Sequence, residues 1–294
     1  MSARIRQILF VPPAPLVWAK HLDAFARQGV EVETTQTLSS DQLGQGLADG
    51  SWDIGIGVMD NVIAWNSERS AGLQIVAQLE RSTVMSYCCV PEHASLADTA
   101  NHAIAVDSTT NGFILVLYRA LARQGIDWRR CTFDPVGGVK QRFDALAAGK
   151  AASTILVPPF DDMALARGFK LLWQGKDIAP AYPGVVACAR ASWLDQNQDA
   201  ILRYLRALLA ANDWAQNNAS TARQALVEAR YSENAAERLV RECVRGLAPA
   251  LAGWEEVIAL RRECGLLPVP QPSAATMINT RPLALAAAGA DSEH

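Results

Sequence analysis

The sequence has little of what metal sites and nucleic-acid surfaces require. It contains four histidines, and no two of them stand at the spacing at which one helix holds a metal ion. Its six cysteines show no CxxC pair and no zinc-finger spacing. The formal net charge is −3, so the chain has no basic excess that would attract nucleic acid. We therefore expect no metal, no cofactor and no nucleic-acid partner.

Common catalytic signatures are missing as well. The chain holds no GxSxG nucleophile motif, no HExxH motif and no phosphate-binding P-loop. The adjacent Cys88 and Cys89 would need a cationic or helix-N-terminal setting to act as nucleophiles, and the sequence shows none. These cysteines fit buried strand residues better. The sequence leaves it uncertain whether the protein is an enzyme.

No hydrophobic run is long enough to cross a bilayer, so we expect no direct membrane insertion. The N-terminus leads almost at once into a strand and shows no apolar region of the kind found in signal peptides. The cysteines fit a reducing compartment. As the sequence stands, we expect a cytoplasmic protein, and a periplasmic one if a leader has been removed.

What the chain does have is a globular composition with alternating strand and helix patterns. Of its 294 residues, 50% are hydrophobic and 19% are charged. Residues 4–11 predict a strand, residues 16–28 have apolar side chains at helical spacing, and strand patterns return at 30–34 and 52–58. This alternation with short turns predicts an α/β fold with parallel strands flanked by helices.

A pair of motifs occurs twice in the same order. The segment Ala26-Arg27-Gln28-Gly29-Val30 returns as Ala122-Arg123-Gln124-Gly125-Ile126, and Leu47-Ala48-Asp49-Gly50 returns as Leu146-Ala147-Ala148-Gly149. Each copy reads strand, helix, strand, helix, strand, which predicts two Rossmann-like lobes of similar design. Ligands of open α/β sheets bind beyond the carboxyl ends of the strands, so two facing lobes would share one cleft.

The lobe boundaries follow from where the chain crosses between the two repeats. We place the first crossing within 73–91 and the return crossing within 182–189. Lobe one then comprises residues 1–88 plus 187–294, including a helical C-terminal region. Lobe two comprises residues 89–186.

The segment 104–113 combines a strand end with a helix start. A short apolar run stops at Ser108-Thr109-Thr110-Asn111, and an apolar helix opens at Ile114. Unpaired backbone N–H groups and hydroxyls at such a point favour an anionic or polar ligand. The alternative is an ordinary helix cap, because Ser, Thr and Asn are preferred there in any case.

Several motifs follow one another along residues 8–215. They are Pro15-Leu16-Val17-Trp18-Ala19-Lys20, Phe25 to Val32, Leu47 to Gly50 with Trp52-Asp53-Ile54-Gly55, Ala105-Val106-Asp107-Ser108, and Val136-Gly137-Gly138 through Arg142 and Gly149 to Val157-Pro158-Pro159. Their order and spacing resemble the NMT1/THI5-like substrate-binding proteins of nitrate, taurine and sulfonate ABC transporters, which have the type II periplasmic-binding-protein fold. The sequence departs from the family at Lys150-Ala151-Ala152-Ser153, where an Asp is usual.

This resemblance implies that the protein binds a small anionic or carboxylated organic molecule and closes a hinge over it. It also implies a membrane permease as partner. The implied ligand contacts lie at strand ends facing the cleft: Trp18, Asp60 and Asn61 in lobe one, and Ser108, Thr109, Thr110, Asn111, Gly138, Pro159 and Phe160 in lobe two. Trp18 and Phe160 would pack against the apolar part of the ligand.

Several of these residues have a structural alternative. Trp18 fits helix packing equally well, Asp60 fits a helix cap, and Gly138 fits a turn that needs backbone freedom. Arg142 fits a solvated or salt-bridged arginine better than a ligand clamp. The alternative function is a cytoplasmic enzyme on the same scaffold, a lyase or decarboxylase, with Asp60 as the candidate catalytic acid or base.

Overall fold

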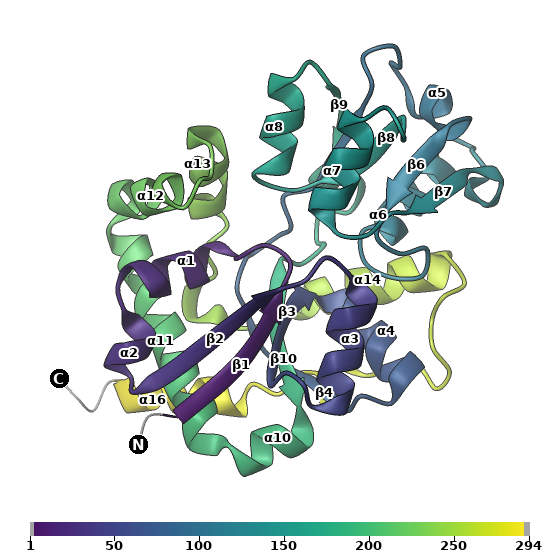
Figure 1. Ribbon diagram of the computed structural model, residues 1–294. Coiled ribbons are helices and arrows are strands. Elements are labelled where there is room, and N and C mark those ends of the chain that lie inside the picture. Colours follow the sequence, from purple (N-terminus) through teal and green to yellow (C-terminus); the bar gives the residue numbers. More distant parts are fainter. Residues whose placement is uncertain (1–2, 291–294) are drawn as a thin grey trace.

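The computed structural model describes residues 3–290 and shows two α/β lobes, each built on a five-stranded sheet (Figure 1). The strands of the first sheet are β1 (Ala3–Leu9), β2 (Val30–Gln36), β3 (Ile54–Val58), β4 (Leu73–Gln78) and β10 (Val185–Arg190). Those of the second sheet are β5 (Ser86–Cys89), β6 (Ala103–Val106), β7 (Thr132–Pro135), β8 (Ser153–Leu156) and β9 (Lys170–Gln174). The predicted two-lobed α/β fold is confirmed.

The two sheets have the same strand order. The first runs β2-β1-β3-β10-β4 and the second β7-β6-β8-β5-β9. In each, the first three strands are parallel, and the fourth strand is antiparallel to its neighbours on both sides. The repeated sequence motifs stand before equivalent strands, because Gly29 and Gly50 precede β2 and β3 as Gly125 and Gly149 precede β7 and β8.

The chain passes between the sheets in segments 79–85 and 175–184. The first segment lies within the predicted range 73–91, and the second begins before the predicted range 182–189. The predicted boundary at residue 88 falls inside β5, which pairs with β8 and β9 of the second sheet. The predicted boundary at residue 186 falls inside β10, which pairs with β3 and β4 of the first sheet. Each sheet therefore takes one antiparallel strand directly from a crossing.

Most helices belong to the first lobe. They are α1 (Ala14–His21), α2 (Ala24–Arg27), α3 (Ser40–Asp49), α4 (Met59–Arg69), α10 (Ala191–Gln196), α11 (Gln198–Asn217), α12 (Ala219–Glu228), α13 (Glu233–Arg241), the 3-10 turn η2 (Arg245–Leu247), α14 (Leu251–Glu263), α15 (Ala274–Met277) and α16 (Arg281–Ala290). The second lobe has α5 (Leu96–Ala100), α6 (Ile114–Arg123), the 3-10 turn η1 (Trp128–Arg130), α7 (Val139–Ala147), α8 (Phe160–Ala166) and α9 (Gly175–Ile178). In Figure 1, α13 rises toward α8, and α14 lies beneath α6.

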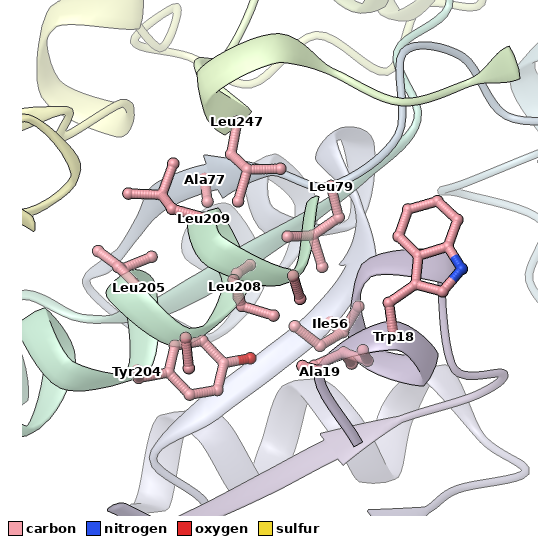
Figure 2. Packing of buried hydrophobic residues seen from close by; sticks show 14 of the residues in the cluster. Trp18, Ala19, Ile56, Ala77, Leu79, Tyr204, Leu205, Leu208, Leu209 and Leu247 are labelled. Atoms are coloured by element: carbon pink, nitrogen blue, oxygen red, sulfur yellow. The ribbon is translucent and has the colours of Figure 1, made fainter. Parts of the chain in front are cut away.

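The core of the first lobe lies between its sheet and α11. Tyr204, Leu205 and Leu208 of α11 are fully buried and form one apolar face of the helix. Figure 2 shows them in one cluster with Trp18 of α1, whose indole Nε1–H donates to the Ala222 carbonyl at 2.9 Å. Along residues 3–290, no helix combines the length and the apolar character that crossing a membrane would require.

Candidate ligand-binding site

A cavity of about 120 Å³ lies between the lobes, where the parallel strands of both sheets end. Its wall includes residues that follow β1 (Phe10 to Pro13), residues of β3 (Ile56 to Val58), residues at the end of β6 (Ala105 to Ser108), and Val157 and Pro158 after β8. This is the edge at which open α/β sheets bind ligands.

The segment after β6 meets the start of α4 across the cleft, so the two lobes are in contact at the cavity. The backbone N–H of Gly112 donates to Asp60 Oδ2 at 2.6 Å. Gly112 has a φ of 76°, and a Cβ there would stand 3.0 Å from Asn61 Oδ1. A side chain at position 112 would therefore strain the backbone and crowd the contact.

Asp60 is fully buried and its carboxylate is already bound by protein groups. Arg261 of α14 donates from Nε to Oδ1 at 2.6 Å and from Nη2 to Oδ2 at 3.1 Å. Burial raises the pKa of Asp60, while the Arg261 guanidinium and the Gly112 N–H oppose that rise. Asp60 is also not among the residues of the cavity wall. These contacts make Asp60 part of the interface between the lobes. They do not support its predicted role as a catalytic acid or base.

Arg142 of α7 has the opposite environment. It lines the cavity and is only 5% exposed, yet within residues 3–290 its guanidinium has no hydrogen-bond acceptor and no ion-pair partner. Its Cζ lies 5.6 Å from the centre of the Phe113 ring. Burial lowers the pKa of Arg142, and the charge of Asp107 opposes this. The cavity thus holds a buried cation that lacks a bound counter-ion from the protein.

Asp107 also lines the cavity. The nearby backbone N–H of Ser40 favours the charged form of its carboxyl group and so lowers its pKa. Burial raises the pKa of Asp107, and the positive charge of Arg142 acts against that rise. The two side chains therefore influence each other through the cavity without forming an ion pair.

Four of the predicted contact residues lie on the cavity wall: Asn61, Ser108, Asn111 and Gly138. The buried Oδ1 of Asn61 has no hydrogen-bond partner among the described residues. The backbone N–H of Gly138, one of the implied ligand contacts, donates to the Leu38 carbonyl at 2.8 Å. A Cβ at Gly138 would lie 3.1 Å from Phe10 Cδ1, so the small residue serves the close approach of the lobes.

The remaining predicted contact residues are placed away from the cavity wall: Trp18, Asp60, Thr109, Thr110, Pro159 and Phe160. Trp18 is buried in the core because the apolar face of α1 packs on α11 and α12. Thr109 and Thr110 are exposed to solvent. Phe160 packs on Phe143, with ring centres 5.7 Å apart. The ring of Phe160, which we expected to contact the ligand, therefore packs inside the second lobe instead.

Other cavity residues gave little or no signal in the sequence. Phe10 lies just after β1, Glu80 lies in the first crossing, and Tyr231 and Leu239 come from the C-terminal helical region. Only Arg142 stood near a recognisable motif, one helical turn after Gly138. The charged residues of this site therefore stand out only in the structure, where they lack the ion-pair partners among the described residues that a buried charge usually has.

The described residues offer no site for a metal and no activated thiol. Across residues 3–290, no group of three or more His, Cys, Asp or Glu side chains is arranged to hold a metal ion. Burial raises the pKa of the Cys88 thiol to about 12, and the nearby Asp161 adds to this rise. At neutral pH the Cys88 thiol is therefore protonated and a poor nucleophile.

Comparisons with known proteins agree on the fold. The model of the NMT1-like family matches residues 2–229. The periplasmic nitrate-binding protein NrtA from Synechocystis PCC 6803 is similar, with a TM-score of 0.80, 16% identity, and coverage of 98% of this chain and 89% of that one. The alkanesulfonate-binding protein SsuA from Xanthomonas axonopodis pv. citri, bound to MOPS, is also similar. Its TM-score is 0.76 and its identity 18%, with coverage of 94% of this chain and 98% of that one. No curated protein matches the sequence.

Proposed function

This chain belongs to the NMT1-like family, and on that premise we propose that it is a solute-binding protein for a small organic anion. The ligand binds in the cavity between the lobes, with its acidic group at Arg142. The observation that carries this proposal is the buried guanidinium of Arg142, which faces the cavity without a protein acceptor.

A buried and unpaired arginine is costly to the empty protein. Taking a charge out of water costs several kcal/mol unless a counter-charge and hydrogen bonds compensate, roughly 3–5 kcal/mol when one partner of a buried pair is removed. The planar guanidinium donates two parallel hydrogen bonds to a carboxylate or a comparable oxyanion. A bound anion would therefore supply the hydrogen-bond acceptors that Arg142 lacks among the described residues.

The rest of the wall favours an organic ligand over a bare inorganic ion. Most of it is apolar, with Phe10, Ile56 and Val84 on the side of the first lobe and Phe113, Leu117 and Ile155 on the other. Ser108, Asn111 and the free Oδ1 of Asn61 add a few polar groups. Mostly apolar walls with a few fixed polar groups are typical of small-molecule sites.

The contacts between lobes describe a closed cleft. Arg238 of α13 pairs with Asp161 at 2.8 Å and with Asp162 at 3.0 Å, both on α8 of the other lobe. The Gly138–Leu38 and Gly112–Asp60 hydrogen bonds close the cleft beside the cavity. The buried ligand enters and leaves when these contacts open and the two crossing segments bend as a hinge.

Within a cell, this binding would serve an ABC-type importer through a membrane permease, and the periplasm is the setting in which such a component acts. Support comes from family membership and from the nitrate- and alkanesulfonate-binding proteins that share the fold.

Thermal stabilisation by a panel of small acids tests the proposal. The panel contains nitrate, linear carboxylates and linear alkanesulfonates. We expect at least one organic acid to raise the melting temperature and to bind with a measurable heat, because binding to the folded state alone stabilises it. Arg142→Met should abolish the response. The matched control is Arg129→Met, which removes an exposed arginine of the same lobe.

The proposal fails if no organic acid stabilises the protein, or if Arg142→Met responds as the wild type does. The same incubations report on the enzyme alternative, since turnover of a panel member would appear as product. Asp60 gives no support to that alternative, because Arg261 and Gly112 occupy its carboxylate away from the cavity.

A further inference from the structure

One acidic side chain of the cavity wall has no cationic partner in the described part of the chain. Glu80 lies two residues after β4, in the first crossing segment, and is 7% exposed. Its carboxylate accepts a single long hydrogen bond from the described residues, from the backbone N–H of Ala14 to Oε1 at 3.4 Å. Within residues 3–290 no Lys, Arg or His forms an ion pair with it. A buried carboxylate with so little compensation is costly in its charged form.

The groups that follow α13 do not supply the missing positive charge. Glu242 adds a second negative charge near Glu80, and its Oε2 accepts hydrogen bonds from the Ser82 backbone N–H and hydroxyl. Arg81 is exposed, and its Nη2 donates to the Cys243 carbonyl at 3.4 Å. Burial raises the pKa of the Cys243 thiol to about 11, so this thiol is neutral near pH 7. The field on this side therefore disfavours a charged Glu80.

The other ionisable groups of the cavity wall leave Glu80 unpaired as well. The Tyr231 hydroxyl donates to the Pro12 carbonyl at 2.6 Å, so its proton is already engaged. Arg142 and Asp107 line the same cavity, and neither forms an ion pair or a hydrogen bond with Glu80 among the described contacts. No histidine belongs to the described wall of the cavity. Glu80 is thus the acid of this wall that has the weakest support for its charge.

The backbone holds Glu80 at the cavity while the lobes are closed. Glu80 forms an isolated antiparallel bridge with Cys243, and Gln78 Nε2 donates to the Glu80 carbonyl at 3.0 Å. Gly184 of the second crossing packs so closely that a Cβ there would stand 2.2 Å from the Glu80 carbonyl oxygen. The side chain therefore has no free segment with which to swing into solvent when an anion enters.

An anion in the closed cavity would place a second negative charge in the same enclosed space as Glu80. Protonation of Glu80 removes that repulsion and leaves the positive charge of Arg142 to the ligand. We propose that Glu80 couples ligand binding to proton uptake: the anion binds at Arg142 while Glu80 takes a proton from solvent and stays a neutral carboxylic acid. This inference rests on the proposed function, since it assumes that an anion occupies the cavity at Arg142.

The proposal fixes the sign of the pH dependence. Burial raises the pKa of Glu80 to about 7, the nearby Glu242 adds to the rise, and the Ala14 N–H opposes it. Near neutral pH the empty protein is therefore a mixture of protonated and charged Glu80. A bound anion raises the pKa of Glu80 further, so affinity is highest below the pKa of the empty protein and falls as the pH rises above it.

Titration calorimetry from about pH 6 to about pH 9 tests the proposal. The probes are the linear alkanesulfonates and carboxylates of the stabilisation panel, which stay ionised over this range. Affinity of the wild type should fall about tenfold across the range. Glu80→Gln is neutral at every pH, so its affinity should stay flat and exceed that of the wild type at the alkaline end. The matched control Glu237→Gln, an exposed acid on α13, should follow the wild type.

A second readout uses the wild type alone and does not depend on the folding of a variant. Calorimetry at about pH 8 in buffers of different ionisation enthalpy reports the protons exchanged on binding. We expect net proton uptake in the wild type and none in Glu80→Gln. A merely structural role for Glu80 would produce neither the uptake nor the gain in affinity at alkaline pH.

The outcomes separate this inference from the proposed function. If acids bind with an affinity that is independent of pH and without proton uptake, the inference is overturned and the anion-binding function stands. Affinity that rises with pH overturns the inference too, as does a pH dependence that persists in Glu80→Gln, which would assign the proton to another group. If no acid of the panel binds at any pH, both proposals fail.

Discussion

Two buried arginines near the cleft have opposite surroundings. Arg261 donates to both oxygens of Asp60 and to the Leu266 carbonyl, and its side chain is 4% exposed. Arg142 is about equally buried, but its guanidinium has no acceptor among residues 3–290, and its Nε is enclosed without a partner. Arg261 thus stabilises the contact between the lobes, whereas Arg142 lies on the cavity wall with no ion-pair partner among the described residues.

This difference separates a structural charge from a binding charge. A buried pair holds elements in register, and breaking it by removing one partner is strongly destabilising. A buried cation with no partner lowers stability in the empty protein and gains its counter-charge only from a ligand. The two arginines should therefore respond to substitution in opposite ways, in stability and in binding.

Removing Arg261 should give the largest effect. Arg261→Met leaves the Asp60 carboxylate buried without its cation, and we expect the free energy of unfolding to fall by about 3–5 kcal/mol. Urea denaturation measures this. The neighbouring Arg262→Met, at an exposed position, is the matched control. If the free energy of unfolding of Arg261→Met lies within about 1 kcal/mol of the wild-type value, Arg261 is not the structural charge that this comparison requires.

Removing Arg142 should have the opposite sign in the same assay. We expect Arg142→Met to be as stable as the wild type or more stable, because the substitution deletes an unpaired buried charge. Its affinity for the acid that binds the wild type should fall about 100-fold, or about 2.8 kcal/mol. Denaturation without ligand and calorimetry with ligand give the two numbers. A large loss of stability would place Arg142 with Arg261 as a structural residue.

Opening the cleft should have a smaller effect. Arg238→Met removes the pairs with Asp161 and Asp162, which join the two lobes at α8 and α13. We expect the free energy of closure to change by about 1.5 kcal/mol and ligand affinity to fall about tenfold. Small-angle scattering should show a larger radius of gyration in the unliganded variant. An unchanged affinity would mean that these pairs do not contribute to closure.

The smallest effect is expected at Trp18, which the sequence indicated as a ligand contact. Trp18→Phe loses the hydrogen bond to the Ala222 carbonyl, at a cost of about 1 kcal/mol in stability. Ligand affinity should stay the same, because Trp18 lies in the core. Calorimetry measures the ligand affinity of the variant. A change of about tenfold would show that Trp18 contributes to ligand binding after all.

The fold was predictable because its signals are local and repeated. The two copies of the glycine-ended motifs mark equivalent strands, and strand ends mark the cleft, so Ser108 and Asn111 were found on the wall. The lobe boundaries at residues 88 and 186 were placed too late because β5 and β10 read as ordinary strands, and nothing local shows which sheet they join.

The chemistry of the site was not predictable, because it depends on partners distant in the chain. Asp60 reads as a free acid until Arg261, 201 residues later, is seen to bind it. Arg142 reads as a solvated arginine because a missing partner leaves no trace in sequence. Trp18 fits an amphipathic helix whether that helix faces a ligand or the core, and only the packing of α11 decides.

The most direct measurement is a crystal structure of the protein with the acid that stabilises it most. The account predicts that the oxygens of the acid lie within hydrogen-bond distance of the Arg142 guanidinium, between closed lobes. An acid bound elsewhere in the cavity, or an Arg142 that pairs with Asp107 while the ligand occupies the site, would contradict it.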